Sequence, residues 1–401
     1  MAQPSTRRTV APADIPRPPF PASPALVAGD WVFLGGTLAT DWKNGIAPPW
    51  RGPADFPYDV PALARQTEGI YETFRTLLRA AGSELAHLVR LDQFTTAHDQ
   101  FRHYLPVRDR YLVRDRPAST AVAIRELLIP DALIQVDGIA ILPREGFYNV
   151  GINTPAAPQP RAGYSMAVRA GDWIWCSGAS PTDFTSRAAY PGGPGHAQPE
   201  EIIVDPNFWY GSEIQNQARY DLKKLALYLE SAGSDLHHAL KAQVYLTDAR
   251  DLGGLITVWR ECFGDDPPAT SVQVIDQMGI AGSRVEINLI ALARGSALGR
   301  EVIRTSAAPP PPPPRSPGDQ GGAVSLPLWP GSSHRRGYRP TRTATGRLTL
   351  PRLARSRRDA GDPGAPRCHL PCGWWLPSRH RPDAAIYSRP PRGRPRARPL
   401  G

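Results

Sequence analysis

Cysteines and long apolar runs are scarce in this chain. It has 4 cysteines in 401 residues, which are too few and too scattered for a disulfide framework. No run approaches the roughly 18 consecutive apolar residues of a membrane-spanning helix, and the N-terminal residues lack the apolar core of a secretory signal. Cys176 and Cys262 each stand among apolar residues, which is typical of reduced, buried thiols. These absences favour a soluble cytoplasmic protein without a membrane partner.

Lysine is absent from residues 301–401, although these hold 19 of the chain's 47 basic residues and only 5 of its 37 acidic ones. Residues 1–300 therefore carry 28 basic and 32 acidic residues, a net charge of −4, against +14 for residues 301–401. A basic fold would favour nucleic-acid binding. Because the part with regular apolar spacing is mildly acidic, nucleic acid is not an expected partner.

Residues 298–401 are expected to form a disordered tail. Positions 301–401 hold 20 of the 46 prolines and have no apolar periodicity, so they cannot bury enough surface to offset chain entropy. Three other interpretations stay open: a polyproline site for a partner, an arginine-rich arm for nucleic acid, and a GC-rich gene read in the wrong frame. Cys368 and Cys372 form one half of a metal site at most. No metal and no cofactor are expected.

One series of elements occurs twice in residues 1–300. In each copy the apolar spacing predicts a strand after Gly-Asp-Trp, a helix closed by glycine, a strand, a second helix and a final pair of strands. Short motifs recur at a constant shift of 151 positions: Ala81-Gly82-Ser83 as Ala232-Gly233-Ser234, Pro117-Ala118 as Pro268-Ala269, and Ile139-Ala140 as Ile290-Ala291. The constant shift indicates an internal duplication.

The expected organisation is a disordered arm over residues 1–22, a first repeat over 23–148, a linker over 149–163 and a second repeat over 164–297. Gly-Asp-Trp recurs after 142 positions rather than 151, so the second repeat has nine extra residues, expected in a loop around 188–208. Three aromatic residues there either cover a cleft or merely hold the loop: Phe208, Trp209 and Tyr210.

The ordered motifs of the two repeats point to a known family. The second repeat carries Cys176-Ser177-Gly178, Gln217, Ala232-Gly233-Ser234, Pro268-Ala269-Thr270-Ser271 and Val285-Glu286-Ile287. The first repeat carries Leu34-Gly35-Gly36, Gln66, Ala81-Gly82-Ser83 and Pro117-Ala118-Ser119. This order, found twice, resembles the RidA (YjgF) family of imine and enamine deaminases. The resemblance implies an α+β fold in which each repeat is a mixed sheet with two helices packed on one face. It also implies trimeric homo-oligomers with small-molecule sites in clefts between neighbouring subunits.

The chain departs from the family at the expected site. The resemblance implies an Arg directly after Pro-Ala that grips the substrate carboxylate, and a Glu on the last strand that positions the attacking water. Here Ser119 and Thr270 follow Pro-Ala, and a hydroxyl offers neither the charge nor the two-pronged geometry of Arg. Arg116 lies an odd number of residues away, so on a strand it points to the other face. The Glu position holds Gln135 in the first repeat and Glu286 in the second, so the first repeat is expected to be a degenerate, structural copy.

Glu286 is the expected catalytic residue, with Thr270, Ser271, Ser177 and Gly178 as substrate contacts. A carboxylate among apolar strand residues is costly to bury unless it is paired or functional. The alternative for Glu286 is an interface carboxylate held by a backbone group or by an arginine, such as Arg284 or an Arg from another chain. The hydroxyl residues could equally be ordinary strand and turn residues.

Three classes of function stay open. The favoured one is a hydrolase or deaminase-like enzyme acting on an imine, enamine or related small molecule without the usual carboxylate grip. The second is a non-catalytic ligand-binding or assembly protein, and the third is nucleic-acid binding or cleavage. The acidic balance of residues 1–300 argues against the third class.

Overall fold

The structure is a computed structural model that describes residues 7–52, 60–184, 199, 202–204 and 212–303. Residues 304–401, most of the predicted insertion and its aromatic residues 208–210 lie outside these ranges. No helix in the described ranges is long and apolar enough to span a bilayer.

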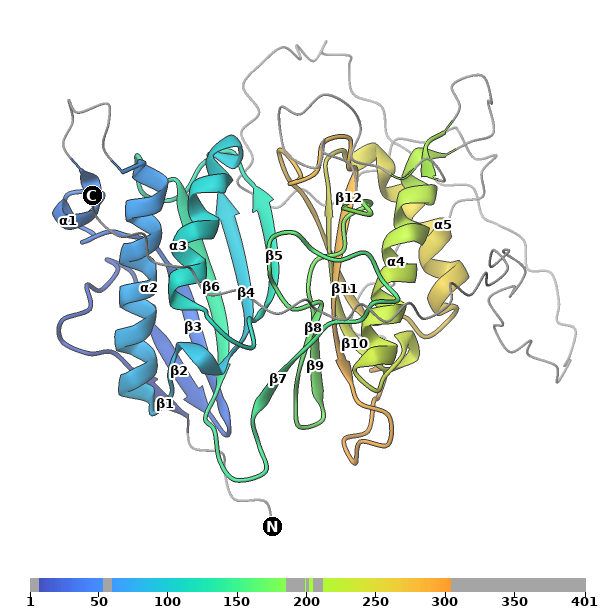
Figure 1. Ribbon diagram of the computed structural model, residues 1–401, viewed down its shortest axis with the longest axis horizontal. Helices are drawn as coiled ribbons and strands as arrows, with labels where there is room; N and C mark the ends of the chain where they lie inside the picture. The colour runs from blue at the N-terminus through green and yellow to red at the C-terminus, as the bar shows by residue number, and fades with distance from the viewer. Residues whose placement is uncertain (1–6, 53–59, 185–198, 200–201, 205–211, 304–401) are drawn as a thin grey trace, which may run out of the picture. The chain divides into compact units, whose positions relative to one another are not determined.

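The first repeat is a six-stranded mixed sheet with its helices on one face (Figure 1). Its elements are β1 (Arg8–Val10), β2 (Ala25–Ala28), β3 (Trp31–Thr37), α1 (Pro48–Arg51), α2 (Ala62–Ala81), β4 (Leu88–Thr95), α3 (Tyr104–Tyr111), β5 (Ala118–Ala123) and β6 (Ile134–Ile141). The strand order is β1-β2-β3-β6-β4-β5. Only β4 and β5 pair in parallel, and α3 lies in the crossover that such a pair requires.

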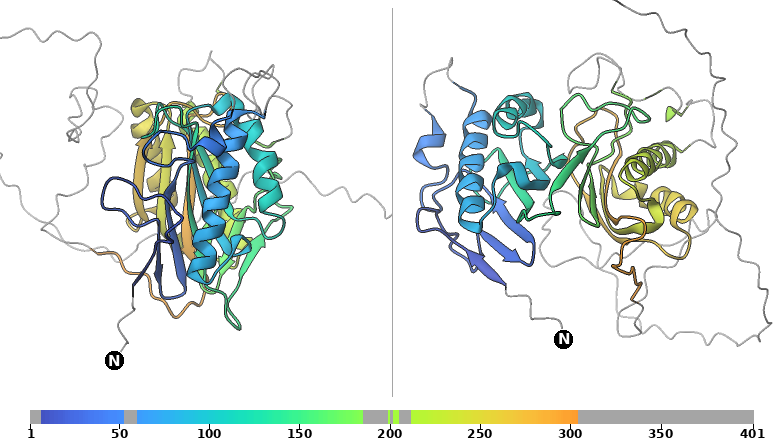
Figure 2. Two further views of the ribbon diagram at one scale, coloured as in Figure 1. Left: turned by 90° about the vertical axis from the view of Figure 1, so that its left-hand side faces the viewer. Right: turned by 60° about the horizontal axis from the view of Figure 1, so that its bottom comes forward.

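The second repeat has the same topology. Its elements are β7 (Asn149–Ile152), β8 (Ala167–Ala170), β9 (Trp173–Cys176), α4 (Glu213–Ser231), β10 (Ala239–Leu246), α5 (Leu252–Phe263), β11 (Ala269–Val274) and β12 (Val285–Leu292). The strand order is β11-β10-β12-β9-β8-β7, and β10 and β11 form the parallel pair. Figure 2 shows that α4 and α5 lie on one side of this sheet, as α2 and α3 do in the first repeat. The predicted α+β fold of two tandem units is confirmed.

The long helices form because apolar residues recur every three or four positions and a glycine stops them. In α2, the side chains of Ile70, Phe74 and Leu77 are fully buried against the sheet. Gly82 then takes the left-handed conformation, with φ of 93°, which ends the helix at little steric cost. Gly233 has φ of 82° at the equivalent position after α4.

The duplication extends to single hydrogen bonds. Buried Gln66 of α2 accepts a bond at Oε1 from the backbone N of Leu133 (2.8 Å), and buried Gln217 of α4 accepts one from the backbone N of Arg284 (2.7 Å). Each glutamine also donates from Nε2 to the backbone carbonyl two residues earlier. Both partners are shifted by 151 positions. In both repeats, this glutamine therefore hydrogen-bonds the long helix to the backbone at the start of the last strand.

Two boundaries differ from the prediction. Arg8–Val10, expected in a disordered arm, forms β1 and pairs with β2, and Asn149–Ile152, expected in a linker, forms β7 and pairs with β8. Strands of three or four residues are too short to give a readable apolar alternation. The arm and the linker therefore each supply an edge strand to a repeat.

The sheet faces opposite the helices contact each other between the two repeats. Val89 and Ala118 of the first repeat share a buried apolar cluster with Val168 and Trp175 of the second. The ring centroids of Trp31 and Trp175 are 4.8 Å apart. This contact brings β5 of the first repeat next to the segment that follows β9 in the second.

Candidate functional site

Glu286 lies inside β12, in a central position of the second sheet. It pairs with Tyr245 of β10, and its side chain is 5% exposed. Burial raises the pKa of Glu286 to about 7 because the charged form loses hydration, while a hydrogen bond from Ser180 and the nearby charges of Arg90 and Lys224 act in the opposite direction. At neutral pH the carboxyl group is therefore present in both protonation states.

The two oxygens of Glu286 have different surroundings. Oε2 accepts a hydrogen bond from Ser180 Oγ at 3.1 Å. Oε1 lies directly over Gly178, where a Cβ would overlap it, so a larger residue than glycine cannot stand there without moving the carboxylate. Among the described residues, no hydrogen bond is made to Oε1. Within the described part of the chain, this oxygen is therefore open to a water or a ligand.

The first repeat contributes a cation beside this carboxylate. Arg90 of β4 is 4% exposed, and it donates from Nη1 to the carbonyl of Cys176 (2.7 Å) and from Nη2 to Thr120 Oγ1 (2.7 Å). It also forms an ion pair with Asp92, with Nη2 and Oδ1 2.5 Å apart. Thr120 accepts a further bond from Asn288 Nδ2 (3.1 Å), two residues beyond Glu286 on β12. The site is therefore built from both repeats.

Three polar side chains of helix α4 extend the site from the sheet toward the helices of the second repeat. We call Asp221, Lys224 and Tyr228 the α4 cluster. Lys224 is 2% exposed and donates from Nζ to the carbonyls of Ser180 (2.8 Å) and Thr182 (3.0 Å). Burial lowers the pKa of Lys224 to about 8, against the opposing charge of Asp221. Lys224 thus fixes the backbone of the residue whose hydroxyl binds Glu286.

Asp221 is fully buried, and neither of its carboxylate oxygens has a hydrogen-bond partner among the described residues. Burial raises its pKa well above the usual range because the charged form loses hydration, while the nearby charge of Lys224 acts in the opposite direction. The hydroxyl of Tyr228 is also buried without a partner in the described part of the chain.

A cavity of about 400 Å³ adjoins the site through Tyr164. It is lined by residues of the first repeat, Asp115 and Arg116 among them, and by Tyr164 and Ser165 of the second. Burial and the charge of Glu286 both raise the pKa of Tyr164, so its phenol lies within electrostatic range of the carboxylate. Arg116, predicted to point away from Ser119, lines this cavity and donates to the carbonyl of Gly163 at 2.8 Å.

A model of the family described as Endoribonuclease L-PSP matches the chain twice, over residues 14–142 and 154–293. Together the two matches cover more than half of the chain. The chain belongs to this family.

Members of the Endoribonuclease L-PSP family match one repeat at a time. A RutC family protein of Pyrococcus horikoshii is 30% identical over 118 residues, which are 29% of this chain and 78% of that protein. The 2-iminobutanoate/2-iminopropanoate deaminase of Mus musculus is 29% identical over 141 residues, which are 35% of this chain and 89% of that protein. A crystal structure of RidA from an Antarctic Psychrobacter bacterium is similar with 26% identity and a TM-score of 0.27, covering 35% of this chain and 97% of that one. The predicted RidA resemblance and tandem repeat are confirmed.

The family motifs of one repeat do not all meet in space, because some of them contact residues of the other repeat. Gly178 lies against Glu286. Ser177 Oγ donates to the carbonyl of Ser165 (2.6 Å) and accepts from the backbone N of Ser119 (2.8 Å), so its buried hydroxyl is engaged within the protein. Gly178 also donates its backbone N–H to the carbonyl of Ser119 (3.0 Å). The residue after Pro-Ala that contacts Ser177 and Gly178, beside Glu286, is therefore Ser119 of the first repeat.

Thr270 and Ser271 lie on β11, which is separated from β12 by β10. They pair with Ala242 and Gln243, whereas Glu286 pairs with Tyr245 further along β10. Both side chains are at least partly exposed at the sheet edge. The two predicted contacts are thus not beside Glu286 within one chain.

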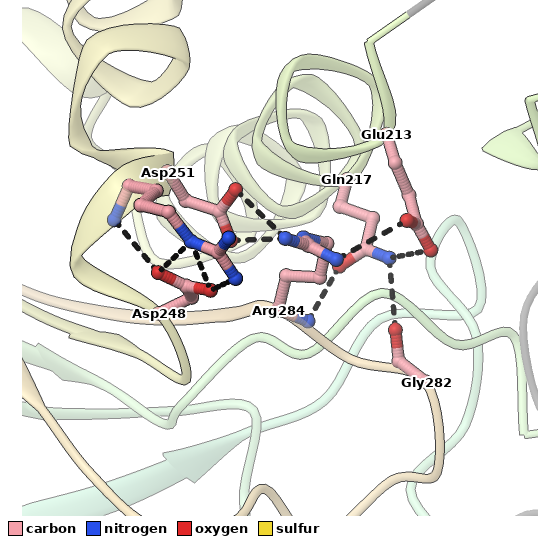
Figure 3. Close-up of polar contacts among 7 residues, drawn as sticks. Glu213, Gln217, Asp248, Asp251, Gly282 and Arg284 are labelled. Atoms are coloured by element: carbon pink, nitrogen blue, oxygen red, sulfur yellow. Dashed lines mark hydrogen bonds and ion pairs between the residues drawn. The ribbon is translucent and has the colours of Figure 1, made fainter. Parts of the chain in front are cut away.

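Arg284, the alternative partner considered for Glu286, binds elsewhere (Figure 3). Its Nε donates to Asp251 Oδ2 at 2.8 Å and its Nη2 to Asp251 Oδ1 at 3.0 Å, while Nη1 lies 3.5 Å from Glu213 Oε2. The figure shows Gln217 between Glu213 and Arg284, so this network secures the entry to β12. The interpretation that Arg284 holds Glu286 is wrong.

The described ranges contain no cluster of side chains arranged to bind a metal ion, and Cys176 is not a reactive thiol. There, no three His, Cys, Asp or Glu side chains are placed to hold a metal ion. Cys176 is fully buried, and burial raises the pKa of its thiol to about 12. Its thiol is therefore protonated at neutral pH and is part of the packed core, as predicted.

Proposed function

We propose that this protein is a hydrolase that acts on a small imine, enamine or related electrophilic intermediate, with Glu286 activating water. The observation that carries the proposal is a buried carboxylate with a pKa of about 7 and one oxygen without a partner among the described residues. A carboxyl group with a pKa near the working pH can accept a proton and return it within one cycle. The name of the mouse relative, 2-iminobutanoate/2-iminopropanoate deaminase, supports an imine as the substrate class.

The reaction would proceed in two steps, in each of which Glu286 relays one proton to the nitrogen. Glu286 takes a proton from water as the water oxygen attacks the imine carbon, and it delivers this proton to the nitrogen, which gives a carbinolamine. Glu286 then transfers the hydroxyl proton to the same nitrogen while the C–O double bond forms and the C–N bond breaks. Ammonia and a carbonyl compound leave, and the carboxylate is ionised again.

Arg90 determines which substrates suit this site. It is the guanidinium beside Glu286, and it donates to Thr120 on the neighbouring strand β5. Its forked donors already bind Asp92. A substrate carboxylate would have to displace Asp92 to reach them. We therefore propose substrates that do not depend on a carboxylate grip.

We expect ammonia release to be accelerated more strongly for imines without a carboxylate than for the imine derived from alanine. Both can be generated during the assay, and ammonia release is measured with and without the protein. The variant Asp92→Asn, which frees Arg90, should raise the rate on the alanine imine. Asp30→Asn, at an exposed ion pair with Arg144, is the control and should change neither rate. If no imine of the panel is hydrolysed faster with protein, the non-catalytic ligand-binding or assembly function replaces this proposal.

The proposal includes assembly with further copies, trimeric as the resemblance implies. β11 is an edge strand with an outward face, on which Val272 is 40% and Val274 is 58% exposed. Its first-repeat equivalent, β5, is covered by the second repeat. Exposed apolar edge strands tend to be covered in solution, and Thr270 and Ser271 would then contact a ligand across the interface. A native mass equal to one chain would contradict this assembly.

A further inference from the structure

The first repeat contains a cavity of about 270 Å³. Its wall is formed by three parts of the repeat: residues 15–24, residues 35–42 and the side chains of Thr73 and Leu77 on α2. Gln135 of β6 and Leu128 complete it. None of the described residues that line it is charged. The volume is near the lower end of small-molecule sites, which begin at roughly 300 Å³.

This cavity is the first repeat's copy of the Glu286 site. Its lining residues correspond, at shifts of 142 positions before the insertion and 151 after it, to the residues that surround Glu286. The pairs are Ala22 and Tyr164, Gly36 and Gly178, Leu38 and Ser180, Thr73 and Lys224, Leu77 and Tyr228, and Gln135 and Glu286.

The exchanges between the two copies remove charge from the first-repeat site, and three of them also reduce the size of the side chain. Ala22, Thr73 and Leu77 are smaller than their counterparts, so the space that Tyr164, Lys224 and Tyr228 fill in the second repeat is open in the first. Ile70 of the first repeat replaces Asp221. The charged and acidic groups of the second site are thus replaced by neutral ones, while the surrounding fold is kept.

The cavity nevertheless retains directed polar groups. Gln135 Nε2 donates to Asp137 Oδ1 at 3.2 Å, which orients the amide, and Oε1 has no partner among the described residues. Gly36 lies against this amide, where a Cβ would meet it. Phe20 and Trp42 also line the cavity, with ring centroids 5.8 Å apart at an interplanar angle of 88°. Aromatic walls with a few fixed polar groups are typical of sites for small planar ligands.

We propose that the first repeat holds a second small-molecule site, in this cavity, for an uncharged planar ligand that carries an amide or similar hydrogen-bonding group. An ion would lose its hydration there without a charged residue in the wall to pair with, and the Asp137 carboxyl behind the wall is already bonded to Gln135, so anions and cations are both disfavoured. The ligand's donor would bind Gln135 Oε1, and its ring would lie against Trp42 and Phe20. This site does not depend on the catalytic role of Glu286.

The test uses three probes of equal size and different charge: benzamide, benzoate and benzamidine. Their dissociation constants are measured on the full chain by protein-detected NMR, which also locates each probe by the signals it shifts. Benzamide is expected to bind at least about tenfold more tightly than either ion, because burial of an unpaired charge costs more than 1.4 kcal/mol. Its shifts should fall on residues of the cavity, such as Thr37 and Gln135.

The variant Thr73→Lys introduces the residue that the second repeat has at this position. It should reverse the preference, so that benzoate binds more tightly than benzamide. Thr257→Lys is the matched control, because Thr257 is exposed on α5 and, like Thr73, donates to the carbonyl four residues earlier. It should leave all three constants unchanged. Leu128→Lys at the 65% exposed rim serves as a second variant if Thr73→Lys does not fold.

Three results would overturn the proposal. They are the absence of benzamide shifts at the cavity, equal or tighter binding of an ion to the unmodified chain, and an unchanged preference in the folded lysine variant. Loss of imine hydrolysis in any of these proteins would bear on the second repeat alone, so the two proposals fail separately.

Discussion

Replacing Glu286 with glutamine is expected to lower kcat on an accepted imine by about 100- to 10 000-fold, the usual contribution of a general acid–base group. Glutamine keeps the size of the side chain and can still accept a bond from Ser180, but it cannot take a proton from water. The matched control is Glu261→Gln, the same exchange at an exposed ion pair with Arg219, which should leave kcat unchanged. Turnover by Glu286→Gln at the unmodified rate would remove Glu286 from the mechanism.

The pH profile distinguishes a catalytic from a structural role of Glu286. Its pKa is raised to about 7, and the ionised form is the one that accepts a proton. The rate should therefore fall as the pH decreases below about 7 and should level off above it. The residual rate of Glu286→Gln should lack this inflection. A variant that was merely misfolded would lower the rate at every pH and keep the inflection.

Replacing Lys224 with methionine is expected to lower the free energy of unfolding by about 2–4 kcal/mol. The ammonium group is the donor to the carbonyls of Ser180 and Thr182, and a buried acceptor left without a donor costs roughly 1–3 kcal/mol. Relief of the buried charge offsets part of this loss. Denaturant-induced unfolding, followed for the full chain, measures the difference.

Lys223→Met is the control for this substitution, because Lys223 is exposed on the same helix. A change within about 0.5 kcal/mol is expected there, as for most surface positions. Equal losses for the two variants would show that α4 tolerates neither change for reasons unrelated to the buried carbonyls. The loss of stability in Lys224→Met would then not be due to its hydrogen bonds with Ser180 and Thr182.

The architecture could be predicted from the sequence because both repeats show the same local patterns of apolar spacing and helix-ending glycines. The helical spacing of Ile70, Phe74 and Leu77 and the stop at Gly82 predict α2 almost to its ends. The recurrence of Gln66 as Gln217 also marks a real structural bond. The short strands β1, β2, β7 and β8 were not predicted, since three or four residues carry too little pattern.

The candidate site was harder to predict from the sequence because it combines residues of both repeats. The family resemblance implies that Glu286 and the residue after Pro-Ala belong to one site, but it does not say which β strand lies against Gly178. Arg90 could have been noticed as a charge inside an apolar strand, two residues before Asp92 on the same face. The α4 cluster lies on a helix whose apolar residues fit a core face, and its proximity to Glu286 depends on tertiary packing.

The contact of Ser119 with Ser177 and Gly178 has a consequence for how this protein can evolve. When identical single-repeat chains form a site between them, one mutation alters every copy of that site at once. In this chain the two halves of the junction are encoded by different codons, so Gln135 and Glu286 can be selected independently. The duplicated chain therefore carries two positions, 135 and 286, where an assembly of identical single repeats carries one. A substitution at either position leaves the other unchanged.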